Sequence, residues 1–222
     1  MDFVFPPLCL GCGDFTEDED AVCESCRRTM ATFNRPFCLN CLAFLPAAGS
    51  CASCGESSRP LFAGANYVAP VEDIIIQFKF KNIATPARFF AKLIRDQFAE
   101  DILRLEADVL VPVPLYYSRE SFRGYNQATV FAERVAELLS LRVETGIIVR
   151  TKRRRPQSRL NHAQRVTNIR GVFEVTAQAD AGRKVILVDD VVTSGSTVRE
   201  AGRTLERAGY TLAGVISMAH AV

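Results

Sequence analysis

The chain has 222 residues, with 27 basic side chains against 25 acidic ones and a net charge of +2 at pH 7. This length is enough to bury a core, and at roughly 150 residues per domain it predicts one or two domains. No apolar run approaches the roughly 18 to 20 residues that cross a bilayer, and "MDFVFPPLCL" lacks the features of a secretory signal. We therefore expect a cytoplasmic protein without membrane insertion.

The first predicted element is a cysteine-rich, acidic head. Residues 1–60 carry four basic against eight acidic side chains, a net charge of −4, whereas the remaining 23 against 17 give the body +6. All eight cysteines lie in the first 54 residues, in four CxxC units separated by 10, 11 and 9 residues. The units are Cys9 and Cys12, Cys23 and Cys26, Cys38 and Cys41, and Cys51 and Cys54.

The spacing of these cysteines indicates metal binding. Two CxxC turns supply the four thiolates of a tetrahedral zinc site, so eight cysteines predict two closed structural zinc sites. A disulfide framework or a redox CxxC is the weaker alternative in a reducing compartment. Sequential pairing of the units needs only short loops and is favoured, while a cross-braced pairing stays open. We expect a double zinc ribbon over residues 1–58 and a second domain over 59–222.

The body alternates between strand and helix patterns. In chain order we expect a strand over 61–68, a helix over 71–81, a helix over 85–100 with Thr85 as its cap and Pro86 in its first position, and a strand over 108–114. A helix over 128–139, strands over 145–150, 172–175 and 184–190, a helix over 196–210 and a strand over 212–219 follow. Apolar strands that alternate with helices predict an α/β fold, a parallel sheet with helices on both faces.

Ligands of such sheets bind beyond the carboxyl ends of the strands. The stretch "VILVDDVVTSGST", from Val185 to Thr197, places a glycine and hydroxyl residues there. Successive backbone N–H groups and the following helix N-terminus form a cup for one phosphate. The spacing fits neither GxxxxGK[ST] nor GxGxxG. The predicted phosphate loop consists of Val192, Thr193, Ser194, Gly195, Ser196 and Thr197.

Asp189 and Asp190 come directly before this loop. At about the distance of a sugar ring from the phosphate, their carboxylates can accept hydrogen bonds from vicinal hydroxyls or help to hold magnesium. The pattern therefore predicts a sugar phosphate as ligand. The alternative is a pair of solvated aspartates in a turn before a capped helix.

The same stretch resembles the signature of type I phosphoribosyltransferases. The resemblance implies that Asp189 and Asp190 face the ribose 2- and 3-hydroxyls of phosphoribosyl pyrophosphate (PRPP), and that residues 193–197 hold its 5-phosphate. Purine-salvage members usually have an aspartate where this chain has Thr193. Its absence argues against hypoxanthine or guanine as the acceptor.

Further blocks resemble the ComF family, which joins a double zinc ribbon to a phosphoribosyltransferase-like domain and is associated with DNA uptake and competence. They are "FKFK" (78–81), "VPVPL" (111–115), "RESFRGYNQA" (119–128, with Tyr125 in place of a Phe), the segment from Arg150 to Phe173, and the four CxxC units. As further substrate contacts the blocks suggest Lys79, Lys81, Tyr125, Gln157 and Arg165.

Arginines are the natural partners of the pyrophosphate. Arg119 and Arg123 follow a predicted strand of the sheet and are expected to contact it through bidentate hydrogen bonds, with a solvated loop as the alternative. For "RTKRRRP" (150–156) three interpretations stay open: a flap over a polyanion, a nucleic-acid patch, or a solvated hairpin.

Aromatic and histidine side chains are less informative. Phe78, Phe80 and Tyr125 could stack on a base, but core packing is the commoner use of such residues. His162 and His220 have no partner pattern, and we assign neither a catalytic role.

Three functions remain in competition. The first is a magnesium-dependent transfer of the phosphoribosyl group from PRPP to an unspecified acceptor, through an oxocarbenium-like state stabilised by positioned charges. The second is an adaptor that senses PRPP or a nucleotide and whose zinc head docks onto DNA-uptake proteins. The third is a direct single-stranded DNA binder.

Overall fold

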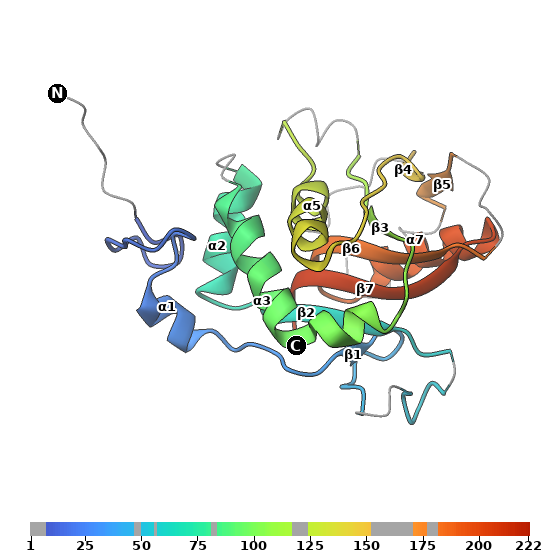
Figure 1. Ribbon diagram of the computed structural model, residues 1–222, viewed down its shortest axis with the longest axis horizontal. Coiled ribbons are helices and arrows are strands. Elements are labelled where there is room, and N and C mark those ends of the chain that lie inside the picture. The colour runs from blue at the N-terminus through green and yellow to red at the C-terminus, as the bar shows by residue number, and fades with distance from the viewer. Residues whose placement is uncertain are drawn as a thin grey trace, which may run out of the picture.

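A computed structural model describes residues 8–46, 50–55, 57–80, 84–116, 124–151, 171–176 and 182–222. Its centre is a five-stranded sheet in the order β1-β2-β7-β6-β3 (Figure 1). The strands are β1 (Phe37–Cys38), β2 (Pro60–Asn66), β7 (Thr211–His220), β6 (Lys184–Val192) and β3 (Val109–Pro112). β2, β7, β6 and β3 are parallel, and β1 pairs antiparallel with β2. The predicted α/β class with a mostly parallel sheet is confirmed.

Helices cover both faces of the sheet. α2 (Val71–Phe80), α3 (Thr85–Leu103) and α5 (Gln127–Leu139) contribute to one core, and α7 (Ser196–Arg207) contributes to the other. Residues of β6 alternate between the two cores, as strand geometry requires. Ile186 and Val188 belong to the core with α3 and α5, whereas Val185 and Leu187 belong to the core with α7.

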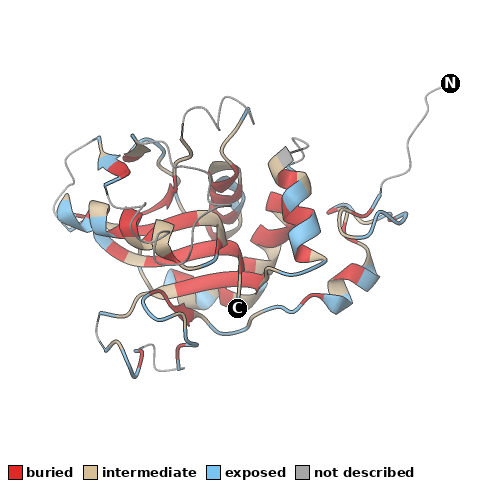
Figure 2. Ribbon diagram, turned by 180° about the vertical axis from the view of Figure 1, so that it is seen from behind, coloured by how far each residue is buried: buried red, intermediate tan, exposed pale blue. Residues whose placement is uncertain are grey.

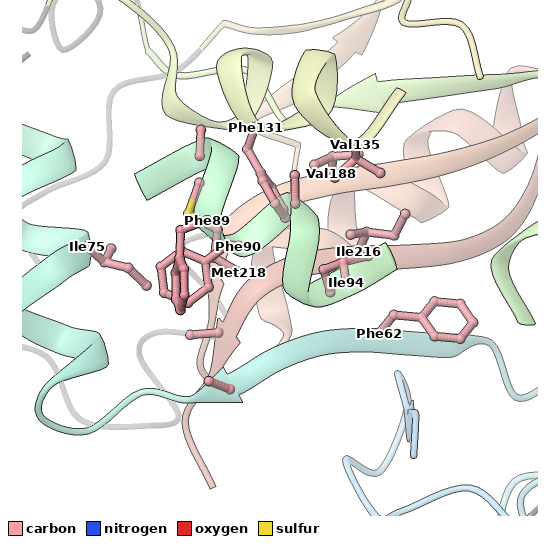
Figure 3. Close-up of a cluster of buried hydrophobic side chains, with 14 of the residues drawn as sticks. Phe62, Ile75, Phe89, Phe90, Ile94, Phe131, Val135, Val188, Ile216 and Met218 are labelled. Carbon is pink, nitrogen blue, oxygen red and sulfur yellow. The ribbon is translucent and has the colours of Figure 1, made fainter. Parts of the chain in front are cut away.

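Both cores consist of aliphatic and aromatic side chains withdrawn from water. Figure 2 shows buried residues running along the central strands, and Figure 3 shows Phe90, Phe131, Val188 and Ile216 meeting between the helices and the sheet. Burying a side chain of this size contributes about 1.5 to 3 kcal/mol. The predicted phosphate loop therefore follows a strand that is packed between two apolar cores.

Three local features differ from the expectations. β4 (Ile148–Arg150) and β5 (Phe173–Val175) pair with each other in a separate antiparallel sheet. Helix α3 has Ala84 at its N-cap, so Thr85 is its first residue and makes no capping hydrogen bond. β6 continues two residues past Asp190, because Val192 still pairs with His220 of β7.

The cysteine-rich head contains one short helix, α1 (Glu24–Thr29), and lies along the body (Figure 1). The carboxylate of Asp20, only 5% exposed, accepts hydrogen bonds from Arg88 and Lys92 of α3. Arg27 of α1 completes this cluster through Asp18 and Asp20. These ion pairs attach the first half of the head to α3. In the described part of the chain no helix is both long and apolar enough to span a membrane.

Candidate functional site

The turn from β6 into α7 forms the predicted phosphate loop. Gly195 is the N-cap residue of α7, with a φ of +68°, and no side chain caps the helix. Within the described part of the chain, the backbone N–H groups of Thr193, Ser194 and Gly195 have no hydrogen-bond partner. The N-terminus of α7 adds its own unsatisfied N–H groups and the positive end of its dipole. This turn can bind an anion such as a phosphate.

Hydroxyl groups surround these N–H groups. Ser194 Oγ and Ser196 Oγ lie 3.0 Å apart, and Thr193 is exposed. A small pocket is lined by Asp189 together with Thr193, Gly195, Ser196 and Thr197. Val192 also lines this pocket, although it is only 2% exposed, and its carbonyl accepts a hydrogen bond from Ala221 N. The loop thus brings one aspartate and the phosphate-binding groups into a single pocket.

The two aspartates are neighbours in β6 but belong to different faces of the sheet. Asp189 lines a pocket with residues at the start of α7, whereas Asp190 pairs with Lys79 of α2, which packs on the other face. Asp189 Oδ1 accepts the N–H of Asp190 at 2.9 Å, and Asp190 Oδ1 accepts the N–H of Val191 at 2.7 Å. The carboxylates are therefore oriented by the strand backbone itself.

The two carboxylates also differ in their charged neighbours. Lys79 Nζ of α2 lies 3.0 Å from Asp190 Oδ2, and both side chains are only 18% exposed. Withdrawal from water and the charge of Asp190 raise the pKa of Asp189 to about 8, against the opposing effect of Lys79 and Arg150. An elevated pKa at a ligand pocket is typical of functional carboxylates. At neutral pH the Asp189 carboxyl must therefore lose a proton before it can bind a cation.

Two residues that were not predicted for the site, Arg199 and His220, contact the loop, and a third, Glu200 of α7, contacts Gly171 just before β5. Arg199 donates hydrogen bonds to the carbonyls of Leu39 and Ser194. His220 Nδ1 lies 2.7 Å from the carbonyl of Val192. Glu200 is 4% exposed and accepts the N–H of Gly171 at 2.8 Å. No local pattern in the sequence indicates these residues, because their contacts with Leu39, Val192 and Gly171 join segments that are distant in the chain.

Other predicted residues have mainly structural contacts. The Tyr125 hydroxyl donates a hydrogen bond to the backbone carbonyl of Phe78. The side chain of Phe78 is fully buried, so this residue belongs to the core. Asn126 caps α5 by accepting the N–H of Ala128, and its amide donates to the carbonyl of Val113. The guanidinium of Arg150 lies over the Phe173 ring, 5.6 Å from its centroid. The predicted contacts Lys81, Arg119, Arg123, Gln157 and Arg165, together with His162, lie outside the described residues.

The cysteines form two separate four-thiol groups. Within each group all Sγ atoms lie within 4.8 Å of one another. The groups are Cys9, Cys12, Cys23 and Cys26, and Cys38, Cys41, Cys51 and Cys54. The sequential pairing is confirmed. Both groups are consistent with zinc ribbons, because four convergent thiolates match the tetrahedral preference of zinc.

One thiol of the first group, that of Cys9, has a lowered pKa. Burial raises the pKa of Cys9, but N–H donors including those of Cys23 and Gly11 outweigh it and lower that pKa to about 6. The thiolate is the form that binds metal. In the same group a backbone hydrogen bond lowers the pKa of Cys12, but desolvation and the neighbouring thiols outweigh it and raise that pKa to about 11, and burial raises the pKa of Cys26.

Comparisons with known proteins agree with both halves of the chain. Residues 1–55 match the double zinc ribbon domain, and residues 126–221 match the phosphoribosyl transferase domain. The chain is 29% identical over 212 residues to competence protein F of Haemophilus influenzae, covering 90% of this chain and 91% of that protein. It is 30% identical over 197 residues to the DNA utilization protein YhgH of Escherichia coli K12, covering 85% of each. Competence protein ComFC of Streptococcus pneumoniae is 24% identical over 201 residues, covering 86% of this chain and 84% of that protein.

Proposed function

Since this chain belongs to the ComF family, which joins a double zinc ribbon to a phosphoribosyl transferase domain, we propose that it binds PRPP at the carboxyl end of β6 and transfers the phosphoribosyl group with release of pyrophosphate. The observation that carries the proposal is the pocket that Asp189 shares with the uncapped N-terminus of α7. An anion cup beside a carboxylate suits a ligand with a phosphate at one end and hydroxyls at the next position.

Different residues are proposed to bind different parts of PRPP. The N–H groups of residues 193–197 and the hydroxyls of Ser194, Ser196 and Thr197 hold the 5-phosphate. Asp189 and Asp190 accept hydrogen bonds from the ribose 2- and 3-hydroxyls. Lys79 lies beside Asp190 and supplies a positive charge on the opposite face of the sheet from α7. Arg119 and Arg123 remain our proposal for the pyrophosphate.

The two carboxylates also fit magnesium. Asp189 and Asp190 are hard oxygen donors at one strand end, beside the proposed phosphate site. When bound with PRPP, magnesium supplies neutralisation of the pyrophosphate charge that develops on bond breaking. The chain's own contribution is to fix the ribose and its phosphate while C1 is exposed to a nucleophile, and to stabilise the separating charges.

Zinc is the metal we propose for both four-cysteine groups. The thiols are all unpaired by disulfides, as expected for a cytoplasmic protein, and a closed four-thiolate site leaves no position for a catalytic water. Two zinc ions per chain should be found by elemental analysis. A content of one or none in the freshly purified protein would contradict this assignment.

Calorimetric titration with PRPP and magnesium tests the binding proposal. The Asp189→Asn, Asp190→Asn double variant should lose PRPP affinity while its circular dichroism spectrum stays unchanged, because amides keep the shape but not the charge. Retained affinity in the double variant would rule out the assigned site. Release of pyrophosphate with a panel of nitrogen bases then separates a transferase from an adaptor that only senses PRPP.

A role in DNA uptake or utilisation is part of the proposal. It is supported by the names of the relatives and by the net charge of +6 over residues 61–222. Single-stranded DNA binding is the alternative use of this charge, and it predicts a gel shift that weakens steeply as salt rises. If no gel shift is seen at low salt, direct DNA binding is ruled out. The remaining alternative is that the zinc head binds a protein partner.

A further inference from the structure

We propose that Arg199 is a positioning residue through which the second four-cysteine site shapes the phosphate loop. The inference rests on the proposed function in one respect, since it takes the loop to be the binding site of a phosphate. The contacts that hold the loop in the ligand-free protein do not depend on that function.

Arg199 connects two segments that are far apart in sequence. Its Nη1 donates to the carbonyl of Leu39 at 2.8 Å, and its Nη2 donates to the carbonyl of Ser194. Leu39 lies between Cys38 and Cys41, two members of the second four-cysteine group, and Ser194 lies in the phosphate loop. One planar guanidinium therefore joins the metal-binding turn to the anion-binding turn, and its fork of donors suits this double contact.

The loop leaves room for this guanidinium only because residue 195 is glycine. A Cβ at Gly195 would lie 2.6 Å from Nη1 of Arg199 and 3.5 Å from the side chain of Leu42. Leu42 also follows directly after Cys41. The second ribbon is thus connected to the loop through the hydrogen bond of Leu39 with Arg199, and the side chain of Leu42 lies near Gly195.

A second connection reaches the other end of the loop. The ring of Phe37 meets the ring of His220 edge to face at a centroid distance of 4.7 Å. His220 Nδ1 in turn lies 2.7 Å from the carbonyl of Val192. Phe37 and Leu39 flank Cys38, so both ends of the loop are held by residues beside one metal ligand.

Charge explains why an arginine suits this place. Among the described residues no carboxylate forms an ion pair with Arg199, and its guanidinium is partly buried. Four thiolates around a zinc ion would leave a net charge of about −2. The guanidinium is hydrogen-bonded to Leu39, beside Cys38, and to Ser194 of the loop, so both a zinc–thiolate centre and a phosphate would stabilise its charge.

The first four-cysteine group has no such connection. Its half of the head is attached to α3 through Asp20, Arg88 and Lys92. No hydrogen bond or ion pair between residues 8–30 and residues 192–199 is found in the described chain. Loss of the first metal should therefore leave the loop in place, whereas loss of the second should release it.

Hydrogen exchange on the full-length, metal-loaded protein tests the structural half without any ligand. The Arg199→Gln variant should raise exchange of the amides in residues 192–197 and 37–42, while Arg203→Gln should not. Arg203 is the matched control because it lies one turn later in α7 and is exposed. Cys41→Ser should raise exchange in the loop more than Cys12→Ser does. If the loop amides exchange equally fast in Arg199→Gln and in wild type, the inference is wrong, regardless of the result of PRPP binding.

Calorimetry tests the functional half. PRPP with magnesium should bind Arg199→Gln at least about tenfold more weakly than wild type, and Arg203→Gln within about twofold. Arg199→Lys should recover only part of the affinity, because an ammonium keeps the charge but not the fork. Equal losses in Arg199→Gln and Arg203→Gln would reduce the effect to net charge and refute positioning. If the wild type itself binds no PRPP, the proposed function fails, and the exchange experiment still decides the connection.

Discussion

The ammonium group of Lys79 lies 3.0 Å from the carboxylate of Asp190, so helix α2 is tied to the end of the strand that carries both aspartates. Lys79 belongs to the FKFK block and Asp190 to the phosphate-loop motif, more than 100 positions later. The pair neutralises one carboxylate and leaves Asp189, with its pKa raised to about 8, as the one that changes charge near neutral pH. The two aspartates are therefore not equivalent.

Replacing Lys79 with methionine should lower the free energy of unfolding and also reduce the affinity for the ligand. The carboxylate of Asp190 loses its partner while only 18% exposed, which should cost about 1 to 3 kcal/mol of unfolding free energy in urea titrations. The pKa of Asp189 should also rise further, because Lys79 opposes its increase. Lys184→Met is the control, since its pair with Glu106 is exposed and should change stability by less than about 0.5 kcal/mol. Equal effects of the two substitutions would contradict this account.

PRPP binding should strengthen between pH 7 and pH 9. Below the pKa of about 8 the Asp189 carboxyl holds a proton and cannot bind magnesium, and above it the carboxylate is available. Affinity measured by calorimetry across this range should follow one ionisation in the wild type. A flat profile would show that Asp189 does not limit binding.

The same carboxyl should lower the stability of the ligand-free protein at high pH. Its pKa in the folded state exceeds the value of about 3.9 expected in the unfolded chain, so the stability it contributes is fully present below pH 3.9 and is lost as the pH rises through about 8. Asp189→Asn should therefore raise the Tm relative to wild type more at pH 9 than at pH 5. An identical shift at both values would indicate an effect unrelated to ionisation.

Gly195→Ala should disrupt the loop for two separable reasons. The φ of +68° is unfavourable for alanine, at roughly 1 to 2 kcal/mol, and the new Cβ would meet the guanidinium of Arg199. Gly146→Ala controls for the first reason, because Gly146 has a φ of +86° and open space around it. PRPP affinity should fall more than about tenfold for Gly195→Ala only. If Gly195→Ala and Gly146→Ala lose similar stability and neither loses PRPP affinity, the loop is not the phosphate-binding site.

Asp20→Asn should loosen the first half of the head. The carboxylate is 5% exposed and holds Arg88 and Lys92, which, despite its burial, lower its pKa. The substitution should cost about 1 to 3 kcal/mol at neutral pH, seen as faster proteolysis within residues 8–36. Because the pKa is lowered, this stability is present above pH 3.9 and fades as the pH falls below it. Glu24→Gln, in the exposed pair with Arg28, should have no measurable effect.

Local patterns were sufficient for much of the fold. The apolar run from Val185 to Val188 and the helical spacing in α3 and α5 predict those elements within a few residues, because burial selects the same periodicity that the backbone imposes. The CxxC spacing likewise predicts two metal-binding groups. The separate β4–β5 pair and the extension of β6 to Val192 depend on partners distant in sequence, so no local pattern indicates them.

Residue types and their spacing were enough to predict eight thiols in four pairs, two carboxylates before a loop of glycine and hydroxyl residues, and most of the strands and helices. Which of these groups contact one another depends on the folded arrangement. It brings Lys79 to Asp190 and places Arg199 between Leu39 and Ser194, across 160 positions of chain. The reason is physical, since residue types and spacing set what each segment can bind, whereas contacts between segments depend on how the sheet and its two cores bring them together.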